Sequence, residues 1–189
     1  MCNFLSAIAS RTGEIYCNPL IDSHEDIIDY FNLRDNQMGH IVRLEFRPEE
    51  KKDLIDISKY KLIVDEPQTP EWFDEELKEK AIERLKVIVK NMIITEDRKV
   101  LVGGAYILAS GNFNKIINCD IKYAGFATIK DAGSATIEYA GFATIKDAGF
   151  ATIKDAGSAT IEYAGSATIK YAGFATIEKI KHINGNPQK

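Results

Sequence analysis

An eight-residue unit repeats without interruption through the C-terminal part of the chain, and this periodicity constrains the fold more than any other feature. Seven copies run from Tyr123 to Glu178, each reading Tyr/Asp-Ala-Gly-Phe/Ser-Ala-Thr-Ile-Lys/Glu. Five of the eight positions never vary, and the other three each alternate between two residues. Short fixed periods are typical of solenoids, in which a unit is stable only when it stacks on its neighbours.

The order of apolar and polar residues within one copy predicts a short β-strand. In the first copy, Ala127 and Ile129 alternate with Phe126, Thr128 and Lys130, which is the period of two that a strand requires. Since the last position is always Lys or Glu, that face lies in water and the Ala and Ile side chains point inward. The Ala-Gly pair before each strand predicts a corner, because glycine accepts conformations that β-branched residues resist. The sequence therefore predicts a β-solenoid.

The number of residues in one coil stays open between 16 and 24, that is, between two units and three. Copies that are three units apart differ at four variable positions in four pairs, whereas copies two units apart differ at nine in five pairs. This comparison mildly favours a triangular coil of three units. Duplication of a block of three units would give the same similarity between copies without any structural meaning.

The chain divides into a small α+β domain at 1–98 and an all-β solenoid (β-helix) at 99–183, followed by a tail at 184–189. The regular repeats at 123–178 are preceded by degenerate strands at 100–108 and 111–117 and followed by an irregular strand at 179–183. In the first domain we expect strands at 2–9, 14–17, 40–46 and 60–65 and a helix over 24–31 capped by Ser23. A longer helix is expected to begin at Thr69-Pro70-Glu71 and to end near Asn91.

Composition excludes several classes of protein. The 189 residues carry a net charge of −4, which argues against a general nucleic-acid-binding surface. No apolar run approaches the roughly 20 residues of a membrane span, and the N-terminus does not read as a secretory signal. Three cysteines form no disulfide framework and favour a reducing compartment. We therefore expect a cytoplasmic protein.

The segments MCNFLSAI, SHEDIIDYF and DEPQTPEWF, followed by SATI-type repeats, resemble a family of uncharacterised proteins from phages and bacteria. The resemblance covers most of the chain, and the repeat is its most distinctive part. It implies an accessory protein of a phage or mobile element that works in the bacterial cytoplasm. It implies no reaction.

The candidates for catalysis are Cys2 and His24. Removal of Met1 would expose Cys2 as an N-terminal cysteine whose own amine could act as base, with His24 as a helper. The alternative interpretation makes Cys2 a small apolar residue at the start of a buried strand. The spacing of Cys2, Cys17 and His24 matches no standard zinc pattern, so we expect no metal site, and no cofactor is implied.

The candidates for binding are mainly aromatic and basic residues that the strand pattern places on the outside. Four phenylalanines on a solvated face would form an apolar patch of the kind that marks contacts, and the interleaved lysines would suit an anionic partner. The residues are Phe126, Phe142, Phe150, Phe174, Lys130, Lys146, Lys154 and, in the first domain, Trp72, which is expected to lie just inside the longer helix.

These features favour a non-enzymatic binding protein. In a phage setting it would act in counter-defence, by occupying a host protein or by sequestering a small anionic ligand such as a nucleotide signal. The alternatives are a hydrolase or transferase that uses Cys2, and a purely structural solenoid. Because an open solenoid end is a sheet edge that recruits another chain, we also expect self-association through the solenoid.

Overall fold

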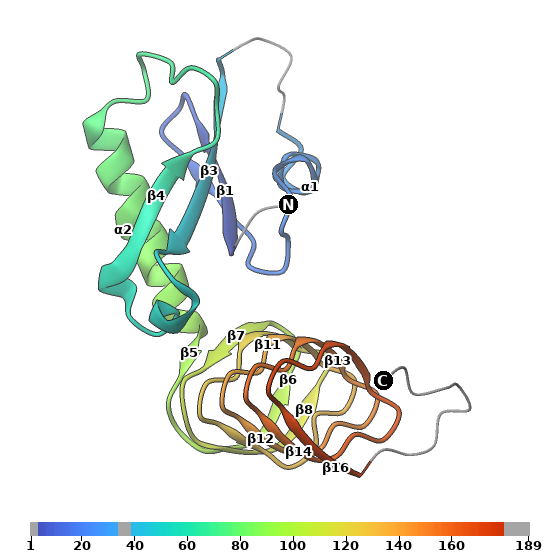
Figure 1. Cartoon of the computed structure of the whole chain (residues 1–189). Helices are drawn as coiled ribbons and strands as arrows, with labels where there is room; N and C mark the ends of the chain where they lie inside the picture. Colours follow the sequence, from blue (N-terminus) through green and yellow to red (C-terminus); the bar gives the residue numbers. More distant parts are fainter. Residues whose placement is uncertain (1–3, 34–38, 180–189) are drawn as a thin grey trace. The chain divides into compact units, whose positions relative to one another are not determined.

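The computed structural model describes residues 4–33 and 39–179, and the chain divides into two compact units, Met1–Met92 and Ile93–Lys189 (Figure 1). The first unit is α+β and the second is a parallel β-solenoid, so the predicted fold class is confirmed. The solenoid begins at Ile93, ahead of the predicted boundary at 99, because Ile93–Ile94 already pairs with Ile107 and Leu108. No described helix is both long and apolar enough to cross a membrane.

The first unit is built on a four-stranded antiparallel sheet in the order β2-β1-β3-β4. The predicted strands are present with shifted ends: β1 (Leu5–Ser10), β2 (Ile15–Tyr16), β3 (Ile41–Pro48) and β4 (Tyr60–Val64). Two 3-10 helices, η1 (Lys51–Asp53) and η2 (Ile57–Lys59), lie between β3 and β4. The first residues of the predicted strand at 2–9, Cys2 and Asn3, lie outside the described residues.

Helix α1 (His24–Tyr30) begins where the sequence predicts, because the Ser23 hydroxyl accepts a hydrogen bond from the Asp26 N–H at 3.2 Å. Its buried Ile27 packs against Ile8 of β1 and Ile41 of β3.

Helix α2 (Glu75–Met92) begins later than predicted. The Asp74 carboxylate accepts a hydrogen bond from the Leu77 N–H at 3.0 Å and so caps the helix, whereas the Pro70 carbonyl accepts from the Phe73 N–H at 3.0 Å in a separate turn. The expected start at Thr69-Pro70-Glu71 was therefore wrong, since Asp74 competes successfully for the cap. Trp72 precedes the helix rather than lying inside it.

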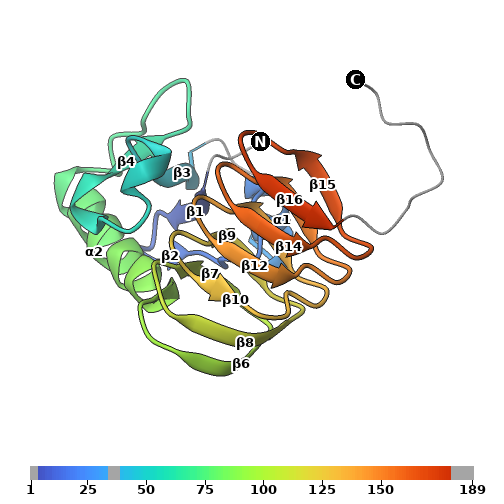
Figure 2. The same ribbon diagram turned by 60° about the horizontal axis from the view of Figure 1, so that its bottom comes forward.

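The second unit consists of two six-stranded parallel sheets on opposite sides of each coil (Figures 1 and 2). The odd-numbered sheet contains β5 (Ile93–Ile94), β7 (Ala105–Leu108), β9 (Asp120–Tyr123), β11 (Thr136–Tyr139), β13 (Thr152–Asp155) and β15 (Thr168–Tyr171). The even-numbered sheet contains β6 (Arg98–Val102), β8 (Asn112–Ile117), β10 (Thr128–Ile129), β12 (Thr144–Asp147), β14 (Thr160–Tyr163) and β16 (Thr176–Lys179).

One coil consists of two octads, so the mild preference for a triangular coil of three was wrong. Thr128 pairs with Thr144, and Ile129 pairs with Ile145, which are the equivalent residues two copies later. The sequence similarity between copies three units apart therefore does not reflect the register. Two facing sheets bring the isoleucines of opposite strands together, whereas the wider centre of a triangular coil would need larger side chains than Ala to fill it.

The inward positions of the repeat form one continuous core, as predicted. The isoleucines from Ile129 to Ile161 and both alanines of the central repeats are fully buried. Cys119, which the sequence places at an inward alanine position, is buried as well. Equivalent residues of successive coils stack on one another in this core. Burial of its side chain lets each isoleucine contribute about 1.5–3 kcal/mol to stability.

The corners between strands depend on glycine. At Gly149 the backbone φ is +57°, and a Cβ placed there would lie 2.9 Å from the carbonyl oxygen of Gly133 in the preceding coil.

We call the turns that lead from an odd-numbered to an even-numbered strand the first corner (124–127, 140–143, 156–159 and 172–175). The turns that lead from an even-numbered to an odd-numbered strand are the second corner (132–135, 148–151 and 164–167).

Candidate binding surface on the solenoid

The register distributes the four exposed phenylalanines over two corners. Phe126, Phe142 and Phe174 lie on the first corner, where the N–H groups of Phe142 and Phe174 donate to Gly125 and Gly157 of the preceding coils. Phe150 lies on the second corner, where its N–H donates to Gly133. The single phenylalanine face expected from the sequence is therefore two separate surfaces, because a coil of two units places successive copies on opposite corners.

Two of the phenylalanines form a stacked pair. The ring centroids of Phe126 and Phe142 are 5.4 Å apart and their planes are inclined by only 6°. The two side chains nevertheless stay 66% and 58% exposed. An aromatic pair in this arrangement is preorganised, so a partner that covers it orders no further side chains.

The basic residues are also divided between the two sides of the coil. Lys130 and Lys146 follow Thr128 and Thr144 on the outer face of the even-numbered sheet, and both are exposed. Lys154 lies on the odd-numbered sheet, where its ammonium group is 3.2 Å from a carboxylate oxygen of Glu138. The three lysines predicted as one set therefore belong to different faces.

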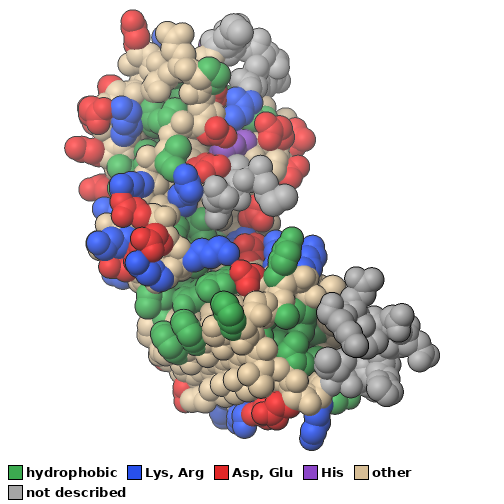
Figure 3. Space-filling view, viewed as in Figure 1, with side chains coloured by type: hydrophobic (Ala, Val, Ile, Leu, Met, Phe, Trp, Pro, Cys, Tyr) green, Lys and Arg blue, Asp and Glu red, His purple; other side chains and the backbone are tan. Residues whose placement is uncertain are grey.

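The structure joins one subset of the candidates into a compact surface. In two neighbouring coils, an exposed phenylalanine on the first corner is followed by a threonine and a lysine on the outside of the even-numbered sheet. We call this surface the Phe–Lys patch, made of Phe126, Thr128, Lys130, Phe142, Thr144 and Lys146. Figure 3 shows hydrophobic side chains exposed on the solenoid among mainly uncharged surface.

The electrostatic surroundings of the two lysines differ. Lys130 lies near Asp97, whose pKa is lowered first by the Asn112 backbone N–H and, to a smaller extent, by the Lys130 charge. Among the described residues, neither Lys130 nor Lys146 has a carboxylate oxygen within the 4.0 Å of an ion pair. The patch is therefore positively charged, most strongly at Lys146.

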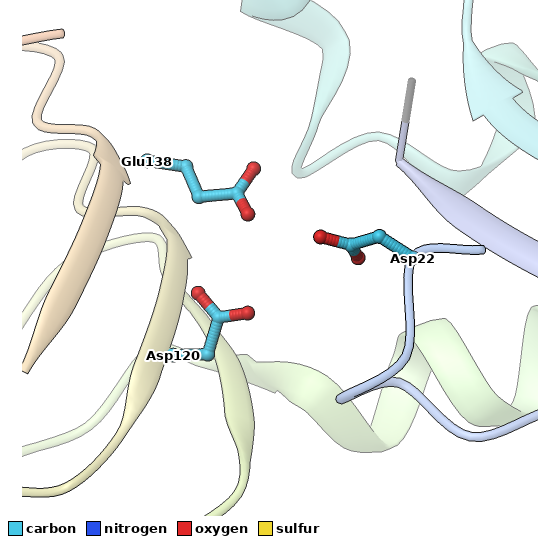
Figure 4. Close-up of side chains that lie close together, drawn as sticks. All are labelled: Asp22, Asp120 and Glu138. Carbon is cyan, nitrogen blue, oxygen red and sulfur yellow. The ribbon is translucent and has the colours of Figure 1, made fainter. Parts of the chain in front are cut away.

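On the odd-numbered sheet, by comparison, lysine and carboxylate side chains pair with one another. The Lys122 ammonium group lies 2.8 Å from Asp120 and 3.1 Å from Glu138. Figure 4 shows these two carboxylates projecting from neighbouring coils. With Lys154 also paired to Glu138, the charges here bind one another, so this face offers less to a charged ligand.

The first position of the repeat, which is Tyr or Asp, stabilises the corners. Where it is Asp, its carboxylate accepts the N–H of the glycine two residues later, at 2.8 Å for Asp131 and 2.9 Å for Asp147. Where it is Tyr in two successive coils, the rings stack, as Tyr123 and Tyr139 do at 5.5 Å. Both residue types therefore stabilise the corners in different ways.

The candidates in the first unit do not form a catalytic group among the described residues. Cys2 lies outside them. His24 is buried at the start of α1, its Nε2 lies 3.0 Å from the Leu44 carbonyl oxygen, and its Nδ1 lies 3.6 Å from Asp65. These contacts tie α1 to β3 and to Asp65, the residue that follows β4.

Trp72 has a structural partner as well. Its indole N–H donates to the Gly39 carbonyl, and its ring packs edge-on against the buried Phe73 at 6.0 Å. Tyr60 packs against Phe4 and Phe46. Trp72 belongs to the first unit and so is not part of the Phe–Lys patch.

A hollow of about 390 Å³ in the first unit holds a second cysteine and two cations, a combination that sequence reasoning did not single out. Lys80 donates to the Gly13 carbonyl at 2.7 Å and Arg84 to the Ile15 carbonyl at 3.0 Å. Both side chains thus hold the β1–β2 hairpin against α2. Cys17 lines the same hollow, and burial raises the pKa of its thiol to about 12.

We expect Cys17 to resist alkylation in the folded protein. Its pKa of about 12, against an ordinary value of 9.0, leaves little thiolate near pH 8, so iodoacetamide should modify it at least about tenfold more slowly than in the unfolded chain. The Cys17 peptide can be followed by mass spectrometry with and without urea. Equal rates in the two conditions would contradict the assignment of Cys17 as a half-buried, neutral thiol.

No family model, no curated protein and no solved structure matches this chain.

Proposed function

We propose that this chain is a non-enzymatic interaction protein whose solenoid docks a partner on the Phe–Lys patch. The observation that carries the proposal is the exposed, parallel pair of Phe126 and Phe142, in line with Lys130 and Lys146 on the same two coils. Apolar side chains kept in water without a covering partner mark contact sites more often than they serve stability. Rigid aromatics beside cations are typical of binding hot spots.

The spacing of the patch defines the chemistry of its partner. Phe126 and Lys130 are four residues apart, which is at most about 13 Å because Phe126 lies on the corner, and neighbouring coils lie about 4.8 Å apart. An extended peptide lying along a coil therefore presents an apolar side chain and a carboxylate about four residues apart. An acidic segment of a partner protein with this pattern fits the patch.

The resemblance to phage and bacterial proteins suggests the biological setting. We place the protein in the bacterial cytoplasm as an accessory factor of a phage or mobile element. Counter-defence by occupying a host protein fits an extended docking surface better than sequestration of a nucleotide signal, because the patch is a row of side chains on an outer sheet face. The partner of this proposal is a host protein with an acidic, apolar segment.

A peptide titration tests the proposal. A fluorescein-labelled extended peptide with Leu and Glu four residues apart should bind the full chain, as measured by fluorescence anisotropy, and the Phe126→Ser/Phe142→Ser variant should bind it at least about tenfold more weakly. Serine occupies the same position in three natural copies, so the variant should keep the fold. Phe150→Ser, which makes the same change on the other corner, is the matched control.

The charge requirement is tested separately. Lys130→Glu/Lys146→Glu should abolish binding of the acidic peptide and transfer the preference to a peptide with Lys in place of Glu. Failure of the unmodified chain to bind the acidic peptide, or an equal loss with Phe150→Ser, would show that the Phe–Lys patch is not the docking surface.

A further inference from the structure

The C-terminal end of the solenoid is the place where the core meets water. In the last coil, Ala167, Ile169, Ala175 and Ile177 are only partly buried, whereas their equivalents one coil earlier are fully buried. Phe174 on the adjoining first corner is 90% exposed, and Tyr171 at the end of β15 is 72% exposed. The last coil therefore presents an apolar cross-section of the core, rimmed by two aromatic rings.

Within residues 4–33 and 39–179, the same end carries two sheet edges on which no further strand lies. Strands β15 and β16 are the last strands of their sheets. One coil earlier, the carbonyls of Gly157 and Ala159 accept hydrogen bonds from Phe174 and Thr176. The equivalent carbonyls of Gly173 and Ala175 accept none from any residue in 4–33 or 39–179. Exposed edges of this kind template the addition of another strand.

The residues that follow Glu178 do not match the repeat. The next octad would place Lys181 at the position that glycine occupies in every copy. At the last such glycine, Gly173, a Cβ would lie 2.7 Å from the Gly157 carbonyl oxygen, at a φ of +59°. Because a residue with a Cβ is disfavoured at such a corner, Glu178 is the last residue of the regular sequence repeat.

We infer that this end binds a second copy of the chain in a two-fold symmetric dimer, in which β15 of each copy pairs antiparallel with β16 of the other. Strands β15 and β16 lie on opposite sides of one coil and run in opposite directions, because a single corner joins them. A two-fold axis parallel to these strands brings each onto the other with the antiparallel orientation that pairing needs.

This arrangement continues the core across the interface. Strands β15 and β16 both begin Thr-Ile, with the isoleucine facing inward. Antiparallel pairing with Ile169 opposite the partner's Ile177 keeps every inward side chain on the core side. The partly exposed isoleucines of both copies then become buried together.

Charge and aromatic stacking select this pairing among symmetric alternatives. The outward charge is Lys170 on β15 and Glu178 on β16, so pairing β15 with the partner's β16 brings opposite charges onto one face. Pairing β15 with its own copy would set lysine near lysine. The chosen axis also leaves the first corners of the two copies together, so that Phe174 meets the partner's Phe174 much as Phe126 meets Phe142.

The oligomeric state of the full chain tests the inference. Analytical ultracentrifugation from about 1 µM to about 300 µM should show a monomer–dimer equilibrium that stops at the dimer, because an isologous interface is closed. Phe174→Ser should raise the dissociation constant at least about tenfold, and Phe150→Ser should leave it unchanged. Circular dichroism of each variant verifies that the solenoid remains folded.

Charge exchange provides the sharper control. Lys170→Glu and Glu178→Lys should each weaken the dimer a few-fold, and the double variant should restore it to within about twofold of the unmodified chain.

Three outcomes would overturn the inference: a monomer at every concentration, a dimer that Phe174→Ser does not weaken, or growth into longer polymers. None of the variants touches the Phe–Lys patch, so this inference and the proposed function fail separately.

Discussion

Replacement of Gly149 by alanine is expected to lower the free energy of unfolding of the solenoid by about 3 kcal/mol. About 1 kcal/mol arises because alanine is disfavoured at positive φ, and about 2 kcal/mol arises from overlap of the new Cβ with backbone. The overlap is with the Gly133 carbonyl oxygen, 2.9 Å from the Cβ position. That oxygen also accepts the Phe150 N–H, so the coil cannot move away without loss of a hydrogen bond. Urea unfolding followed by circular dichroism measures the effect.

Gly103 provides a matched control for the same substitution. Its φ of +60° resembles that of Gly149, but a Cβ placed there has no atom within 4 Å. Gly103→Ala should therefore cost only the conformational part, about 1 kcal/mol. Equal losses at the two positions would show that stacking of coils at the corner does not exclude a side chain.

Truncation of Ile145 to alanine is the second change with a large expected effect, about 3–4 kcal/mol. Ile145 is fully buried on β12, between Ile129 and Ile161 of the adjacent coils. Backbone pairing on both sides fixes the coil spacing, so the core cannot collapse around the cavity. Because stability in a solenoid depends on contacts between neighbouring repeats, a weak coil in the middle should also broaden the unfolding transition.

Ile177→Ala makes the same chemical change at the end of the same row. Ile177 is only partly buried and is the last isoleucine of the even-numbered sheet, so its truncation leaves no enclosed cavity. We expect a loss of about 1 kcal/mol or less, measured at low protein concentration so that association does not contribute. A loss as large as that of Ile145→Ala would mean that the end of the solenoid is as well packed as its middle. Fluorescence of Trp72, the only tryptophan, follows the first unit separately.

The local elements were predictable where one interaction decides them. Ser23 caps α1 as its position before an acidic first turn suggests, and the inward positions of Ala127 and Ile129 follow from alternation alone. The start of α2 was not predictable in this way, because Asp74 and Thr69 are both acceptable caps and only the folded chain selects between them. The local sequence is compatible with more than one helix cap, and packing in the folded chain determines which one forms.

For the candidate binding surface, exposure of the side chains was predictable from the sequence but their neighbours were not. Alternation correctly places Phe126, Phe142, Phe150 and Phe174 in water. It does not indicate which of them are neighbours, since that depends on the coil length. With two octads per coil, Phe126 meets Phe142 while Phe150 lies on the other corner. The pairing of Lys154 with Glu138 is likewise a consequence of register.

The repeat by itself determined that the C-terminal part is a β-solenoid with alanine and isoleucine inside, because the side-chain direction in a strand is a local property with a period of two. Only the tertiary structure decided that two units close a coil. Closure depends on how two sheets fill the space between them, which no single octad encodes. Every neighbour relation on the surface, including the Phe–Lys patch and the exposed last coil, follows from that closure.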